Sequence, residues 1–211
     1  MTGALAVAAV LVVAWFAAGT FWNVRKGSAA MKWMHGGLPL LGERTTVRWL
    51  GSTLVEMGIE RAQAPFERVA VVVFLEPRDL PWMWAASRSR GRRDTLIVRG
   101  VLRAAPRADL EVLDRASWSG RDGMRRIASG DWLLREPSAP GDLAVYSKTP
   151  AALALADAMI ALARQAGVTV RRLEVLRGER AFHLHIALPP ATAAAADVFG
   201  AVQALAQRAT A

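Results

Sequence analysis

The chain has 211 residues, a formal net charge of +9 at pH 7 and no cysteine, and 53% of its residues are hydrophobic. The lack of cysteine excludes a disulfide framework, and the roughly 165 residues after position 44 are enough for one domain that needs no metal for stability. Arginine supplies most of the 27 basic residues. Because alanine is also abundant, as GC-rich codon usage produces, the positive charge does not by itself indicate nucleic acid. It also suits an anionic membrane surface.

The first segment, residues 1–22, contains an uncharged apolar run from Gly3 to Trp22 that ends just before Arg25 and Lys26. As a helix this run is about 30 Å long, which matches the hydrocarbon thickness of a bilayer. The alternatives are a cleaved signal peptide and a buried core helix. A signal peptide has basic residues before its apolar core, and a core helix has a polar face, and this run has neither. The segment is therefore predicted to be a transmembrane anchor.

Aromatic and basic residues mark the carboxyl end of this anchor. Trp15 and Trp22 suit the headgroup level of a membrane. Arg25, Lys26 and Lys32 follow the span, whereas no lysine or arginine precedes it. By the positive-inside rule, we expect the N-terminus outside the cell membrane and the C-terminal domain in the cytoplasm.

Residues 23–44 are predicted to form an interfacial juxtamembrane connector. They mix apolar and basic side chains and are interrupted by glycines and Pro39. The segment is too apolar for a solvated linker and too interrupted for a second span. In the alternative interpretation, the stretch from Leu38 to Leu41 packs directly on the following domain.

From residue 45 the hydrophobic period changes toward two, which is typical of strands. A β-branched run around Val71 predicts a strand that is covered on both faces and central in the sheet. Pro77 and Pro81 then introduce a short helix and an arginine-rich loop. The first half is therefore predicted to be a largely antiparallel meander. Strands are expected at residues 45–49, 55–59, 66–75, 95–103 and 108–113, with the helix and loop at residues 80–93.

The second half contains more helix. Thr149 is expected to cap a helix that starts at Pro150, ends at Gly167 and buries a stripe with Leu155, Met159 and Leu162. Glycines and prolines make residues 128–141 the candidate for a subdomain seam. Further helices are expected at residues 117–127 and 192–207, and strands at 142–147, 168–176 and 179–188. The predicted class is α+β: one N-terminal transmembrane helix, then a largely antiparallel sheet domain at residues 45–211 with two or more packed helices. We also expect residues 45–208 to fold alone.

The richest local signal lies between two predicted strands, where two tryptophans precede four arginines. Tryptophan favours the membrane interface, and each basic residue near an anionic leaflet contributes about 1 kcal/mol. The segment is thus a candidate second membrane contact that acts with the anchor. In the alternative, its tryptophans cover the sheet and its arginines point to water. The predicted membrane-contact residues are Trp15, Trp22, Arg25, Lys26, Trp82, Trp84, Arg88, Arg90, Arg92 and Arg93.

Signals for catalysis are sparse. His183 and His185 lie at i and i+2 and therefore on one face of a predicted strand, but two ligands do not make a zinc site. The sequence contains none of the motifs GxGxxG, GxxxxGK[ST], HExxH and GxSxG. We therefore predict no cofactor, no metal and no catalytic residue.

We expect a single-pass, membrane-anchored, non-catalytic interaction or scaffolding module at the cytoplasmic membrane face. Its expected partners are anionic lipid headgroups and a protein that the sequence does not identify. Nucleic acid is disfavoured because there is one tyrosine and no alternation of aromatic and basic residues. The alternatives are a membrane-tethered binder of nucleic acid or another anionic ligand, and an enzyme with scattered site residues. A deep pocket with converging acids would favour the enzyme, a continuous basic groove the nucleic-acid binder, and a tryptophan-rich face the interaction module.

Overall fold

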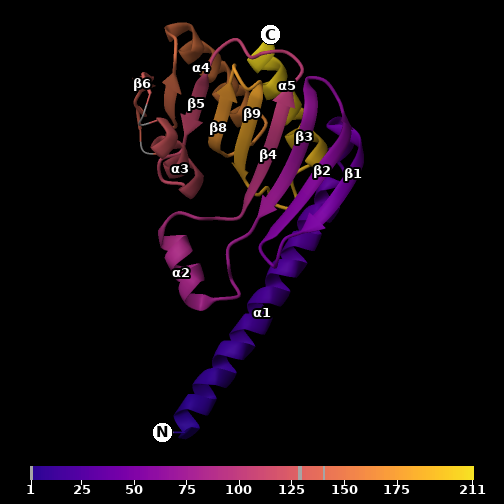
Figure 1. Ribbon diagram of the computed structural model, residues 1–211, viewed down its shortest axis with the longest axis vertical. Helices are drawn as coiled ribbons and strands as arrows, with labels where there is room; N and C mark the ends of the chain where they lie inside the picture. Colours follow the sequence, from indigo (N-terminus) through magenta and orange to yellow (C-terminus); the bar gives the residue numbers. More distant parts are fainter. Residues whose placement is uncertain (1, 128–129, 140) are drawn as a thin grey trace.

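The first helix, α1 (Thr2–Met34), continues without a break past the predicted boundary at Trp22. The computed structural model describes residues 2–127, 130–139 and 141–211. Within those ranges, α1 is the one helix long and apolar enough to cross a membrane, and its apolar part is almost entirely exposed. Residues 23–34 of the predicted connector are therefore part of this helix, which projects from the domain in Figure 1.

The rest of the described chain forms an α+β domain built on one antiparallel sheet, as predicted. Among the described residues the sheet has nine strands in the order β1-β2-β3-β4-β9-β8-β5-β7-β6. Each predicted strand is present, and β6 is an additional short one. The strands are β1 (Gly42–Trp49), β2 (Leu54–Ala62), β3 (Phe66–Phe74), β4 (Thr95–Leu102), β5 (Leu110–Leu113), β6 (Leu133–Arg135), β7 (Ala144–Ser147), β8 (Val170–Leu176) and β9 (Ala181–Ala187).

The strand order departs from the predicted meander at β5. Strands β1 to β4 form the meander, but the β8–β9 hairpin lies between β4 and β5. The run around Val71 belongs to β3, which is third in the order, and β9 is central. Of the predicted seam, residues 128, 129 and 140 lie outside the described residues, and β6 and β7 pair with each other in the same sheet. Alternation identifies a strand but not its neighbours, because pairing partners are chosen by long-range packing.

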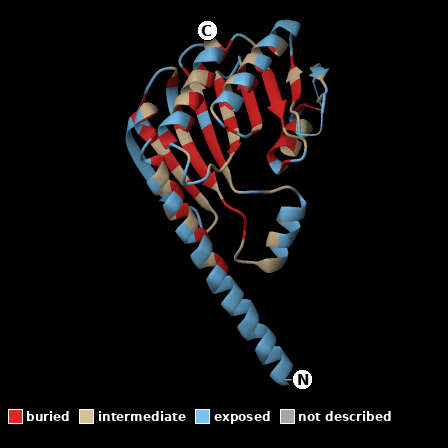
Figure 2. Cartoon of the chain, turned by 180° about the vertical axis from the view of Figure 1, so that it is seen from behind, coloured by how far each residue is buried: buried red, intermediate tan, exposed pale blue. Residues whose placement is uncertain are grey.

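Helices cover the two faces of the sheet unequally, as Figures 1 and 2 show. The helices α4 (Pro150–Gln165) and α5 (Ala195–Thr210) lie on one face together with the end of α1. The shorter α3 (Trp118–Ile127) lies against β5 and β8 on the other face. A further helix, α2 (Pro81–Ser89), lies away from the sheet. The main core therefore fills the layer between the sheet and α4 and α5, into which Phe182, Leu184 and Ile186 of β9 project.

The end of α1 is part of this core. Met34, Leu38 and Leu41 are 0%, 4% and 0% exposed, and Trp33 donates a hydrogen bond from Nε1 to the carbonyl oxygen of Ala193 at 2.6 Å. The 3₁₀ turn η1 (Leu38–Leu40) then leads into β1. Of the two interpretations of residues 38–41, packing on the domain is the one observed.

The helix α4 starts at Pro150 as predicted, but its buried stripe differs from the expected one. Thr149 occupies the N-cap position without making a side-chain capping hydrogen bond. Leu155 and Leu162 are only partly buried. Small side chains let a helix approach its neighbours closely, so the larger leucines lie at the margins of the contact. The buried residues are Ala152, Ala156, Met159, Ile160 and Ala163.

Candidate membrane-interface site

The connection between β3 and β4, residues 75–94, packs against α1 instead of making a tight turn. It carries α2 below the sheet, on the side of the domain from which α1 projects (Figure 1). At Gly19 of α1 an added Cβ would lie 2.2 Å from the carbonyl oxygen of Arg78 and 2.7 Å from Cα of Asp79. Because both atoms belong to the backbone, only glycine permits this approach.

Two polar side chains of the apolar helix reach the same connection. Trp15 donates a hydrogen bond from Nε1 to the carbonyl oxygen of Arg78 at 2.9 Å. Asn23 is fully buried; its Nδ2 donates to the carbonyl oxygen of Glu76 at 3.1 Å, and its Oδ1 accepts from the Arg78 guanidinium at 3.2 Å. Residues three or four apart share a helix face, so Trp15, Gly19, Asn23 and Lys26 form one stripe of α1 along the connection.

Two carboxylates, the buried Glu76 and the partly buried Asp94, form the ion pairs of this contact. Asp94 accepts two hydrogen bonds from the Arg78 guanidinium, at 3.0 and 2.8 Å, and Nζ of Lys26 lies 2.5 Å from it. Burial alone would raise the pKa of Asp94, but the hydrogen bonds from Arg78 and Lys26 outweigh it, so the pKa lies below its usual range. Glu76, which is 2% exposed, accepts a hydrogen bond from Arg88 at 3.2 Å. Of these ion pairs, the one between Lys26 and Asp94 joins α1 to the domain, and the others lie within the connection.

The tryptophans of α2 do not cover the sheet. Trp84 is half-buried beside α1; its Nε1 donates to Oε2 of Glu76 at 2.6 Å, and its ring centroid lies 6.5 Å from that of Trp15. Trp82 and Met83 are 57% and 45% exposed. The connection therefore presents apolar side chains beside a helix that is itself apolar and exposed.

The arginines of the connection are divided between inward and outward positions. Arg92 turns toward the protein, with its guanidinium carbon 4.1 Å from the ring centroid of Phe74. Arg93 donates to the carbonyl oxygens of Arg88 and Arg92 at 2.8 and 2.7 Å. Of the predicted contact residues, the structure brings Trp15, Lys26, Trp84 and Arg88 together at the α1 contact, and it leaves Trp22, Arg25, Trp82 and Arg90 exposed.

The sequence analysis did not identify the central residues of this site, namely Gly19, Asn23, Glu76, Arg78 and Asp94. A local signal exists for two of them. Asn23 is a polar residue at the end of an apolar run, and Glu76 directly follows a buried strand. Neither position reveals its partner, because the ion pairs and hydrogen bonds join residues far apart in the chain.

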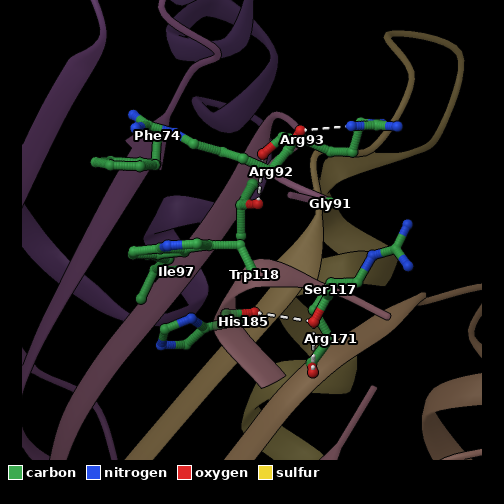
Figure 3. Close-up of a pocket in the computed structure, with 11 residues that line it drawn as sticks. Phe74, Gly91, Arg92, Arg93, Ile97, Ser117, Trp118, Arg171 and His185 are labelled. Carbon is green, nitrogen blue, oxygen red and sulfur yellow. Dashed lines mark hydrogen bonds between the residues drawn. The ribbon is translucent and has the colours of Figure 1, made fainter. Parts of the chain in front are cut away.

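A small cavity lies between this connection and α3, and Figure 3 shows the residues around it. The rings of Phe74 and Trp118 are stacked, with centroids 5.8 Å apart and an interplanar angle of 12°. The enclosed space is about 10 Å³, roughly the room that one water molecule needs. The cavity is therefore a packing feature and not a substrate pocket.

A cluster of buried charges lies under α3. Arg172, which is 3% exposed, has its Nε 2.7 Å from Glu111 and its NH2 2.9 Å from Glu174, and His183 lies 2.7 Å from the other oxygen of Glu174. A Cβ on Gly123 would lie 2.4 Å from Oε1 of Glu111, so α3 closes directly over the cluster. Burial raises the pKa of Glu111 to about 7, against the opposing effect of Arg172. Acids do converge here, but α3 covers them.

No protein-family model matches this chain, and no curated protein is significantly similar to it.

Proposed function

We propose that this chain is a single-pass membrane-anchored, non-catalytic interaction module, with its N-terminus outside and its domain at the cytoplasmic face. The observation that carries the proposal is the packing of the β3–β4 connection on α1, beside which Trp82 and Met83 are exposed. Exposed tryptophan next to an apolar helix is favourable at the headgroup layer and unfavourable in water. The domain would then contact the membrane at two places, α1 and α2.

A cleaved signal sequence is the competing explanation for α1. Cleavage before Lys26 would remove the side chains of Trp15 and Asn23, which hydrogen-bond the backbone of the β3–β4 connection. Each of these hydrogen bonds stabilises the docked helix and would be lost on cleavage, so the contacts favour a retained helix. Mass measurement of the protein extracted from membranes tests this point. A mature product that lacks Trp15 and Asn23 would refute the anchor.

The second contact is tested in liposomes with a fluorophore attached to one introduced cysteine, since the chain has none of its own. We expect a label at Met83→Cys to be quenched by nitroxides at the headgroup depth. Val47→Cys on β1 is the matched control, because Val47 is 52% and Met83 45% exposed. Equal quenching at the two positions would contradict a membrane contact through α2.

The edge strand β1 is the surface that we propose for a protein partner. It is last in the sheet order, and its residues from Glu43 to Arg48 are exposed, so its outer backbone groups can accept another strand. A photo-crosslinker at Val47 should give a discrete protein adduct in cells, whereas one at Met83 should give lipid adducts. If Val47 gives no protein adduct, the interaction proposal fails.

The orientation is tested by a fusion to Ala211. A reporter that is active only outside the cytoplasmic membrane should be silent there, because the basic residues after Trp22 favour a cytoplasmic domain. Strong reporter activity would reverse the proposed orientation.

A further inference from the structure

Two cavities meet at the junction of α1 and the β3–β4 connection. One, of about 400 Å³, runs along the apolar part of α1 between Trp15, Trp22 and Trp84. The other, of about 470 Å³, lies further along α1, between Trp33 and the turn after β9. Lys26 and Arg78 line both cavities. Each volume is within the range of ligand pockets, and the two shared cations make the cavities neighbours.

The two cavities differ in chemical character. The first is walled by tryptophan rings and by Ala18 and Gly19 of the apolar run. The second has an apolar side formed by Trp33 and residues 187–191, but charged groups line it as well. Among the described residues these are the cationic side chains Lys26, Arg78, Arg88 and Arg93 and the carboxylates Glu76 and Asp94. The number of charged side chains in the lining therefore rises along α1, as headgroups follow hydrocarbon in a bilayer.

The cationic cavity has an excess of positive charge. Asp94 is shared by Lys26 and Arg78, while Arg88 pairs with Glu76 and still exposes 49% of its side chain. The Arg93 guanidinium donates to two backbone carbonyls, which leave its charge uncompensated. A phosphate group supplies negative charge and several acceptor oxygens, which suit arginine donors.

We propose that one phospholipid with a net negative headgroup binds across the two cavities. Its phosphate lies near Arg78, Arg88 and Arg93, and the start of an acyl chain lies along Ala18 between Trp15 and Trp22. This inference rests on the proposed function, because it requires α1 to be in the bilayer. The bound lipid fills the gap between α1 and α2 and fixes the tilt of the domain at the membrane.

Native mass spectrometry of the full chain in a nonionic detergent tests the site. With added phosphatidylglycerol we expect one retained lipid, and with phosphatidylcholine none. The double variant Arg88→Gln/Arg93→Gln should weaken retention about thirtyfold, from two basic contacts. The control Arg44→Gln/Arg48→Gln removes the same charge from exposed positions on β1 and should retain the lipid. Equal retention of both lipids, or equal loss in both double variants, would overturn the proposal.

A second variant keeps the test independent of the arginines and of folding. Ala18→Leu fills the apolar cavity from an exposed helix position and should reduce retention while the thermal melt stays unchanged. Soluble glycerol phosphate should not compete; competition at equal concentration would show a phosphate site without a lipid chain and would overturn the proposal. Alkaline extraction of membranes distinguishes failure of the lipid site from failure of the membrane anchor. A chain that stays in the membrane but retains no lipid contradicts this inference alone, and a chain that is extracted contradicts the anchor itself.

Discussion

The substitution Gly19→Ala adds one methyl group where α1 meets the β3–β4 connection. The new Cβ would lie 2.2 Å from the carbonyl oxygen and 2.5 Å from the carbonyl carbon of Arg78. Contacts between such atoms need more than 3 Å, so the connection must move away from α1 by about 1 Å. Neither atom is the end of a flexible side chain, so no rotamer change relieves the clash.

The expected cost follows from the contacts that depend on this approach. The hydrogen bond from Trp15 to Arg78 contributes about 1 kcal/mol, and the buried amide of Asn23 loses bonds that contribute about 1–2 kcal/mol more. The higher helix propensity of alanine is gained in both the docked and the undocked states, so it cancels. The docking equilibrium should therefore weaken by about 2–3 kcal/mol, or about 30- to 150-fold.

Hydrogen–deuterium exchange of the full chain in detergent measures this change. The nine-residue α2 is too short to be stable alone, so its amides should exchange faster in proportion to undocking. Amides of β3 and β4 should be unaffected. Gly3→Ala is the control in the same helix, because a Cβ there meets nothing within 4 Å. Unchanged exchange in α2 of a folded Gly19→Ala protein would refute the reasoning.

Three further predictions concern the domain. A fragment of residues 45–211 lacks Met34 and the leucines of η1, so its unfolding free energy should fall by at least about 5 kcal/mol relative to residues 25–211; equal urea midpoints would contradict this. Asp94→Asn leaves Lys26 and Arg78 without their shared carboxylate, which should weaken docking of the connection on α1 by about 3 kcal/mol and speed amide exchange in α2 accordingly. Glu43→Gln removes a carboxylate from an exposed ion pair and should leave exchange in α2 unchanged. The pKa of Glu111 is raised from 4.5 to about 7 in the folded protein, so the native state holds this proton after the unfolded state has lost it. As pH rises from 4.5 to 7, the unfolding free energy of the wild type should therefore fall by up to about 3 kcal/mol relative to that of Glu111→Gln. Urea titrations at several pH values measure both free energies, and a difference between them that does not change with pH would refute the prediction.

Much of the secondary structure followed from local patterns. The apolar run from Gly3 to Trp22 predicted a transmembrane helix, and the structure has a long exposed helix there. The alternation within residues 179–188 predicted a strand, which the structure shows as β9 with Phe182 and Leu184 buried. These predictions succeeded because the periods of helices and strands depend only on residues that are close together in the sequence. The predicted stripe of α4 was right at Met159 but not at Leu155 and Leu162, because leucine is the more hydrophobic residue but alanine is the one that fits a close approach.

The sequence by itself determined the apolar helix, the strand-forming segments and the α+β class, since each depends on residues within a few turns of one another. Only the tertiary structure decided that the β8–β9 hairpin separates β4 from β5, that Met34 belongs to the core, and that Asp94 meets Lys26. The candidate site belongs to this second group. In the linear sequence its charged residues look like ordinary surface residues. They form a site because packing at Gly19 brings the β3–β4 connection against α1. Burial there makes an unpaired charge costly, so each charged group needs a particular partner.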